Sequence, residues 1–445
     1  MITTTEHQTS IRGIAKYIPL YFCVFLSLAL LLCENILAYQ AYEIIFEIMS
    51  SSLSVLLIVI MVYFYFARAR FLSLQLLYAY AFSLIIGIPA IYLLIFRELT
   101  HGFELVCLWC ILLNVILYFS SFSSRVVSQG KSVNTLFTFL FYVVGFCQLF
   151  KTFLYFKFII GSGLGHLAIY TEGDALIAQV PFVIRAISGF SLIMSLATFY
   201  FRAPTSLRLI SFLLLASELL IGIRSKFFFS LICIIVLSLY SLRYIIKNKF
   251  VKISRIQNLA IGFILFSLIS YFREGYEINF VSYLIIVLDS LSSTLAGLQD
   301  VFVLPVSQGW DKIDANIIFT QIFPISGLGF ISDSQIYKEF SLIVLGDISS
   351  GIALSSSGIL EATVLNIKFS FFIYLCYLLC MLAFIQKCLN SSLVILNFIA
   401  IAMLPGLFYS IRGELVLPFA YIIKSFPIIL LAPLLTSCSN KVGNK

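Results

Sequence analysis

Two cations stand in the short connection between two long apolar segments of this sequence. Arg224 and Lys226 belong to the stretch Gly222-Ile-Arg-Ser-Lys, which links the apolar runs 207–222 and 227–246. A connection this short keeps both charges at the boundary of the apolar phase, because so few residues cannot carry them into bulk water. Both are therefore candidates for binding an anion at that boundary. The simpler interpretation is a pair of cations that extend along apolar surface toward water.

Three further arginines are predicted on the same side of the protein as this connection. Arg185 lies near the start of the run 181–201, Arg273 directly follows the run 257–272, and Arg412 belongs to a tight turn. The planar guanidinium fork of arginine matches the oxygen atoms of a phosphate in pairs. Several such groups at the depth of lipid headgroups indicate an anion that is itself carried in the membrane. A lipid-linked pyrophosphate has these properties.

The composition explains why these charges must lie at a membrane boundary. Hydrophobic residues make up 61% of the 445 residues, the mean hydropathy is +1.08, and charged residues make up only 11%. A soluble domain carries roughly 25% charged residues. The sequence therefore predicts an all-α polytopic integral membrane protein with about 12 transmembrane helices of about 20 residues each. The predicted spans are 17–33, 51–67, 71–96, 105–122, 132–150, 181–201, 207–222, 227–246, 257–272, 368–386, 391–411 and 415–436.

The charges between these spans predict their orientation. Lys and Arg are enriched in cytoplasmic loops, and a cytoplasmic N-terminus places the basic clusters of alternate loops in the cytoplasm as well. Among the acidic residues, only Glu6 and Glu218 are not in or near a loop of the opposite side. Both termini are therefore predicted in the cytoplasm. The formal net charge of +8 is a topology signal rather than an indication of nucleic-acid binding.

Two loops on the outer side of the single membrane domain 1–445 are long enough to carry chemistry. The medium loop, 151–180, contains His166, and the large loop, 273–367, contains Trp310. Both side chains are candidates for contacts with a sugar, and a loop as long as the second is usually functional. The cytoplasmic connections are short and the chain lacks GxxxxGK[ST], which disfavours an ATP-driven pump.

Three features of the apolar segments leave alternatives open. Residues 278–304 are apolar enough to be interfacial, re-entrant or spanning, although Asp289 and Asp300 disfavour a span. Glu218 is a carboxylate inside an apolar run, where ionisable groups are usually functional. It could instead neutralise an arginine or join two helices. Glu361 precedes the run 368–386, where it could cap a helix or form an ion pair.

The layout of these elements resembles that of the O-antigen polymerases. The matching features are the G-x-R turn at Gly222 between two central spans, the large outer loop late in the chain, and the turn Arg412-Gly-Glu414 before the last span. A further feature is the Gly- and Ser-rich segment that ends in Glu361 before a span. The resemblance covers most of the chain in layout and rests on few residues.

The resemblance implies a glycosyltransferase of the bacterial inner membrane that needs neither metal nor cofactor. Such an enzyme moves a growing glycan from undecaprenyl pyrophosphate onto the sugar of an incoming lipid-linked unit, and a chain-length regulator protein is an expected partner. Matched by position, Arg224 and Glu361 would be catalytic, with Glu361 as the base. Arg224, Lys226, Arg273 and Arg412 would bind the pyrophosphate.

Other functions of multispan proteins remain as alternatives. An O-antigen ligase shares the overall plan but uses a histidine in its large outer loop, and residues 273–367 contain none. A lipid-linked oligosaccharide flippase would carry cations in a central cavity and have short loops on both sides. A secondary transporter would need polar or broken helices at mid-depth.

Overall fold

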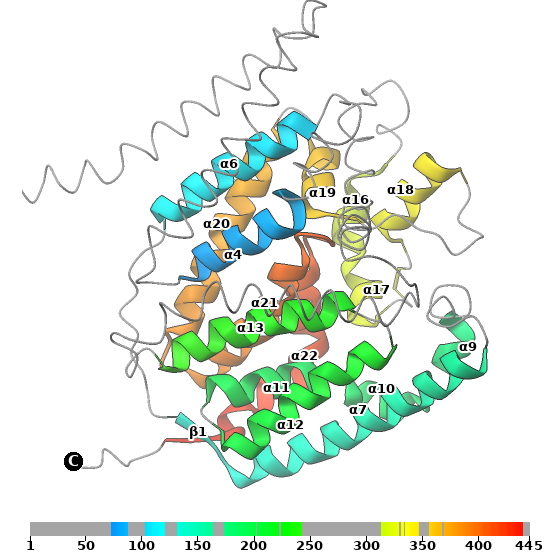
Figure 1. Ribbon diagram of the computed structural model, residues 1–445, viewed down its shortest axis with the longest axis vertical. Coiled ribbons are helices and arrows are strands. Elements are labelled where there is room, and N and C mark those ends of the chain that lie inside the picture. The colour runs from blue at the N-terminus through cyan, green and yellow to red at the C-terminus, as the bar shows by residue number, and fades with distance from the viewer. Residues whose placement is uncertain are drawn as a thin grey trace, which may run out of the picture. The chain divides into compact units, whose positions relative to one another are not determined.

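The computed structural model describes most of the chain from residue 73 onward and is mainly helical (Figure 1). The described residues are 73–87, 103–120, 131–162, 173–201, 203–221, 224–242, 313–328, 331–332, 334–346, 356–366 and 369–438. The predicted spans 17–33, 51–67 and 257–272 and the segment 278–304 lie outside this part of the chain. The structure divides into two compact units.

The first unit comprises residues 1–123, 248–310 and 362–377. Its described elements are α4 (Leu74–Phe82), the π-helical turn η1 (Ser83–Gly87), α6 (Phe103–Ser120) and the start of α20 (Ser370–Leu389). The buried hydroxyls of Tyr78 and Tyr374 lie 2.7 Å apart, and Asn114 donates a hydrogen bond of 2.7 Å to Ser83. These buried polar pairs join helices that are otherwise apolar.

The second unit comprises residues 124–247, 311–361 and 378–445. Its longer elements are α7 (Thr135–Gly161), α10 (Phe182–Ser188), α11 (Ser191–Tyr200), α12 (Thr205–Ala216), α13 (Arg224–Leu242), α21 (Val394–Tyr409) and α22 (Leu417–Leu435). The shorter elements include α9 (Gly173–Ala178), α16 (Asn316–Thr320), α17 (Ile322–Ser326), α18 (Ile336–Leu345) and the 3-10 turn η3 (Ser217–Ile221). The helix α21 packs against α22, α13 and α11, while α7 packs against α10, α11 and η3.

The helix α7 has the polarity of a membrane helix, with its apolar face outward. Exposed residues recur every three or four positions along its whole length, and Phe146 is 70% exposed. The face turned toward the protein contains Gln148 and Thr152, both buried. A helix in water shows the opposite arrangement, because there the apolar face turns inward. Apolar groups outside and polar groups inside are expected where the surroundings are lipid.

In the described part of the chain, four helical segments are long and apolar enough to cross a membrane. They are Thr135–Gly161, Phe182–Tyr200, Ser370–Leu389 and Leu417–Leu435. These segments confirm an all-α architecture with membrane-compatible helices, apart from one two-stranded ribbon described below. The full set of twelve spans stays a prediction.

The structure differs from the prediction at the end of one span and within the predicted large loop. The run 132–150 continues as α7 to Gly161, so the first part of the predicted medium loop is helical. In the predicted large loop, the described segments include α16, α17, α18 and α19 (Gly358–Leu365). Sequence patterns miss both because Lys151 and Lys157 interrupt the apolar run of α7, and the short helices of the large loop contain no long apolar run.

One end of the second unit is joined by polar contacts among segments far apart in sequence. Strand β1 (Lys131–Val133) pairs antiparallel with β2 (Thr436–Cys438). The Lys131 ammonium donates to the Ser392 carbonyl and, at 3.2 Å, to Asn397, which stabilises a buried cation. The predicted orientation places all of these segments on the cytoplasmic side.

The helices α21 and α22 approach closely at Gly406. A methyl group on this residue would lie 2.6 Å from the backbone nitrogen of Pro418 and 2.7 Å from its Cα atom. Backbone atoms cannot move aside as the end of a side chain can. The contact between the two helices therefore depends on the absence of a side chain at residue 406.

We expect Gly406→Ala to destabilise the second unit by about 1–3 kcal/mol, because the methyl group must push α21 and α22 apart. Thermal unfolding of the detergent-purified protein measures the effect. The control is Gly161→Ala, at the end of α7, where a methyl group would meet no atom of the described structure within 4 Å. Equal melting temperatures of the two variants would contradict the close packing.

Candidate functional site

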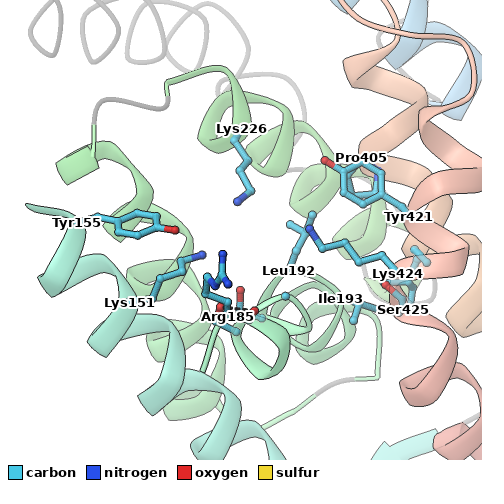
Figure 2. Close-up of a pocket in the computed structure, with 15 residues that line it drawn as sticks. Lys151, Tyr155, Arg185, Leu192, Ile193, Lys226, Pro405, Tyr421, Lys424 and Ser425 are labelled. Carbon is cyan, nitrogen blue, oxygen red and sulfur yellow. Dashed lines mark hydrogen bonds between the residues drawn. The ribbon is translucent and has the colours of Figure 1, made fainter. Parts of the chain in front are cut away.

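The second unit contains a cavity of about 170 Å³ onto which four cationic side chains converge. Lys151, Arg185, Lys226 and Lys424 direct their nitrogen atoms toward the same space, and Tyr155 and Tyr421 stand beside them (Figure 2). Serine side chains and the apolar residues of α11 and α21 complete the lining. The cavity is thus polar on the cationic side and apolar elsewhere.

Each of the four cations belongs to a different helix. Lys151 comes from α7, Arg185 from α10, Lys226 from the first turn of α13, and Lys424 from the first half of α22. Each tyrosine lies three or four positions from a lysine of its own helix, and residues at this spacing lie on the same face of a helix. Tyr155 lies four residues after Lys151 on α7, so both reach the cavity.

Two irregular points in the helices make room for the cavity. The predicted span 181–201 is interrupted between α10 and α11 at Gly189, where a methyl group would lie 3.3 Å from the Cε atom of Lys424. The missing side chain lets the Lys424 stem pass across this break. On α21, Pro405 lines the cavity and lacks the N–H that would bond to the carbonyl of Ile401.

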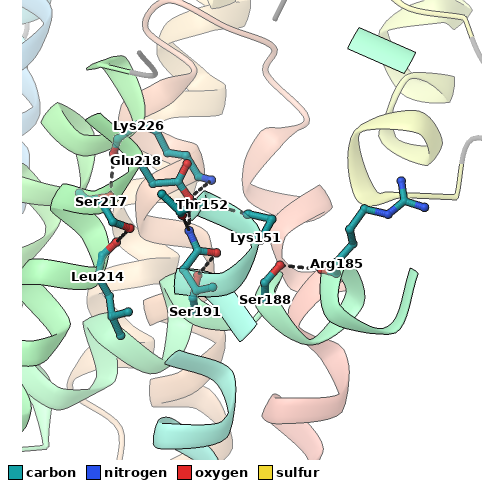
Figure 3. Close-up of polar contacts among 11 residues, drawn as sticks. Lys151, Thr152, Arg185, Ser188, Ser191, Leu214, Ser217, Glu218 and Lys226 are labelled. Carbon is teal, nitrogen blue, oxygen red and sulfur yellow. Dashed lines mark hydrogen bonds and ion pairs between the residues drawn. The ribbon is translucent and has the colours of Figure 1, made fainter. Parts of the chain in front are cut away.

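Glu218 is the counter-charge of two of these cations, Lys226 and Lys151 (Figure 3). Its carboxylate is 2.8 Å from the ammonium of Lys226 and 4.0 Å from that of Lys151. Gln148 donates a hydrogen bond of 2.7 Å to the same carboxylate oxygen, and Ser191 donates to the Gln148 carbonyl at 3.3 Å. The carboxylate is therefore fixed by groups from α7, η3, α11 and α13.

Arg185 and Lys424 have no carboxylate partner in the described part of the chain. The Nε atom of Arg185 is buried and has no hydrogen-bond partner there. Four cations against one carboxylate, Glu218, leave three formal positive charges around the cavity. Uncompensated charge in a partly buried site is costly unless an anion is bound. The arrangement is suited to binding a compact, multiply charged anion such as a phosphate group.

Two of these four cations are among the candidates predicted from the sequence. Lys226, a predicted pyrophosphate ligand, lines the cavity, as does Arg185 from the same predicted surface. Arg412 is half-buried in the turn before α22 and does not line the cavity. Arg224 begins α13, but its side chain lies outside the described part of the structure.

Three other predicted site residues lie outside the described residues altogether. They are Arg273, His166 and Trp310. Their roles as a pyrophosphate ligand and as sugar contacts stay predictions.

Sequence reasoning missed Lys151 and Lys424. Lys424 is the only Lys or Arg inside the apolar run 415–436, and Lys151 directly follows the run 132–150. A lone cation inside an apolar run is a signal of the same kind as the carboxylate of Glu218. Applied to both signs of charge, that rule would have found Lys424.

Glu361, the predicted base, is completely buried away from the cavity lining. One of its oxygens accepts hydrogen bonds from Gln321 at 2.8 Å and Ser356 at 3.2 Å, and the other accepts from the backbone N–H of Leu415 at 2.8 Å. Burial, reinforced by the nearby charge of Glu414, raises the pKa of Glu361 to about 8 despite these hydrogen bonds. The carboxyl group thus connects three segments of the chain, which contain Gln321, Ser356 and Leu415.

We expect the stability of the protein to depend on the proton of Glu361. The folded pKa of about 8 lies above the ordinary value of 4.5, so the folded state binds this proton more tightly than the unfolded state. The stabilisation is complete below about pH 4.5 and is lost as the pH rises through about 8. Glu361→Gln cannot titrate, so the melting temperature of wild type should fall relative to this variant between pH 5 and pH 9, as measured in detergent. Parallel curves would contradict the raised pKa.

Models of protein families, curated proteins and solved structures all gave no match to the sequence or to the structure. The resemblance to O-antigen polymerases therefore stays a prediction from the sequence. The case for a function rests on the chemistry of the cationic cavity.

Proposed function

We propose that this protein is a membrane glycosyltransferase that polymerises oligosaccharide repeat units linked to undecaprenyl pyrophosphate. The acceptor and donor would meet on the outer face of the inner membrane, and the product would be O-antigen or a similar surface polysaccharide. The observation that carries the proposal is the cavity lined by Lys151, Arg185, Lys226 and Lys424. Its net positive charge and its position between apolar helices suit the pyrophosphate of a lipid.

In the proposed reaction, a hydroxyl oxygen of the incoming unit attacks the anomeric carbon of the growing glycan. A new carbon–oxygen bond forms as the bond between that carbon and the pyrophosphate oxygen breaks. The leaving oxygen keeps the electron pair, so the lipid pyrophosphate gains one negative charge, and the hydroxyl proton passes to a base. Cations held in place before the reaction stabilise this growing charge more than they stabilise the substrate.

The depth of the cavity supports a ligand that stays in the membrane. The orientation predicted from the loop charges places the ends of α7, α10, α13 and α22 that carry the cations toward the outer face. Tyr421 and Lys424 belong to one of the four helical segments that are able to span a membrane. A headgroup attached to an isoprenoid chain would reach this depth with its chain in the surrounding lipid.

The base predicted from the sequence, Glu361, is already engaged by other groups of the protein. Glu361 is buried and its oxygens are occupied by Gln321, Ser356 and Leu415. A base must reach the hydroxyl whose proton it removes. If Glu361 is the base, activity should rise with pH through about 8, because only the deprotonated carboxylate accepts a proton.

A lipid-linked oligosaccharide flippase is the second candidate. It is favoured by the location of the cations inside a cavity and by the break at Gly189, since transporters hold substrates at interrupted helices. The helices that fold part of the predicted large loop favour the polymerase instead, because a flippase would have short loops on both sides. The two functions differ in the glycan that remains when the protein fails.

We expect Lys151→Ala to abolish polymerisation in a strain that lacks the wild-type gene. Polymer longer than one repeat should fall by at least about tenfold, since removal of one preorganised donor typically costs about 100-fold or more in rate. Surface polysaccharide resolved on a gel measures the loss. The control is Lys157→Ala, an exposed lysine on the same helix that does not line the cavity.

The surviving bands separate the candidates, provided that both variants reach normal membrane levels. A single-repeat band without longer products supports the polymerase. Loss of the single-repeat band as well would point to a flippase or a ligase. An unchanged ladder in Lys151→Ala would contradict both.

A further inference from the structure

Glu218 holds the ammonium groups that a bound anion would need. Its carboxylate oxygen lies 2.8 Å from Lys226 and 4.0 Å from Lys151, and both lysines line the cavity. An ammonium group in contact with this carboxylate is only partly available to a second anion. The cavity therefore contains one anionic group of its own, directly beside the space for the ligand.

The carboxylate is fixed, whereas the lysine is free to move. The side chain of Glu218 is only 6% exposed and accepts the amide N–H of Gln148 at 2.7 Å. The side chain of Lys226 is 35% exposed and ends at the cavity. When an anion enters, Lys226 can turn toward it while Glu218 stays in place, because a lysine has a long and flexible stem.

We propose that Glu218 is a built-in counter-anion that competes with bound phosphate groups for Lys226 and Lys151, and thereby sets how readily the pyrophosphate product leaves. This inference rests on the proposed function, because it takes a lipid pyrophosphate as the ligand. Glu218 acts through the lysines and is a positioning residue. Glu218 pairs with the ammonium groups of Lys226 and Lys151 when no anion is bound, and it pairs with them again as the product leaves.

The charge of Glu218, rather than its shape, carries this role. Glu218→Gln keeps an oxygen that can accept from Lys226 and Gln148 but removes the negative charge. The bound pyrophosphate then meets one more uncompensated cation and one fewer anion. A role confined to holding the helices together predicts the opposite result, since losing an ion pair would loosen the site and weaken binding.

The test is the affinity of the full-length, detergent-purified protein for farnesyl pyrophosphate, a soluble isoprenyl pyrophosphate. Glu218→Gln should bind at least about tenfold tighter than wild type, because a unit charge even about 12 Å from the ligand changes its affinity by that factor at an effective dielectric constant of about 20. Glu218→Asp, which draws the carboxylate back from Lys226, should tighten binding by a smaller factor. The control is Glu339→Gln, the same change at an exposed carboxylate on α18, and it should leave the affinity unchanged.

The possible outcomes distinguish the role of Glu218 from the proposed function. Tighter binding by Glu218→Gln supports the inference, and equal or weaker binding overturns it while leaving the anion site in place. If Glu218→Gln does not fold, Glu218→Asp decides in the same way. Wild-type protein that binds neither farnesyl pyrophosphate nor inorganic pyrophosphate would contradict the proposed function itself. Binding of inorganic pyrophosphate alone would show a free anion, not a lipid headgroup, as the ligand.

Discussion

A cation that leaves water for the interior of a helical membrane protein needs a nearby anion or hydrogen-bond acceptor. Two sets of polar contacts in the second unit meet this requirement. At one end, Lys131 donates to Ser392 and Asn397. Around the cavity, Lys226 and Lys151 share Glu218. The first site satisfies its cation with neutral oxygens, whereas the second leaves more positive charge than its carboxylate can compensate. This difference separates a structural contact from a candidate binding site.

The helices of the second unit also provide polar surroundings for buried cations. Gln148 and Thr152 of α7 turn toward the protein, whereas Phe139, Phe146 and Phe153 turn away from it. The break at Gly189 gives the stem of Lys424 a path to the cavity. Because irregular backbone in membrane helices is tolerated only where it is buried in protein or lines a cavity, a break of this kind marks the place where the protein interior is polar.

The sequence predicted the helical membrane class and the signs of charge at the site, but not the full set of site residues. Composition alone requires helices in lipid, because each backbone amide must be paired within its own segment. Lys226 and Arg185 were recognisable because they stand at run ends on the disfavoured side. Lys424 stands out as an isolated cation in an apolar run, but its local sequence is the same whether it points to lipid or to the cavity. Which of these it does depends on the rotation of α22 against the helices on which it packs, chiefly α21 and α17. The burial of Glu361 likewise depends on segments distant in sequence, Gln321 and Leu415.

The length of α7 has a consequence for the bilayer around the protein. Its 27 residues would extend for about 40 Å, which exceeds the hydrocarbon thickness of about 30 Å. Apolar side chains such as Phe139 and Ile160 are exposed near both of its ends, so neither end is suited to water. The helix must therefore tilt, or the bilayer must thicken locally beside it. Membrane thickness, and the lipid composition that sets it, would then act on the position of Lys151 within the cavity, although the lipids touch only the opposite face of the helix.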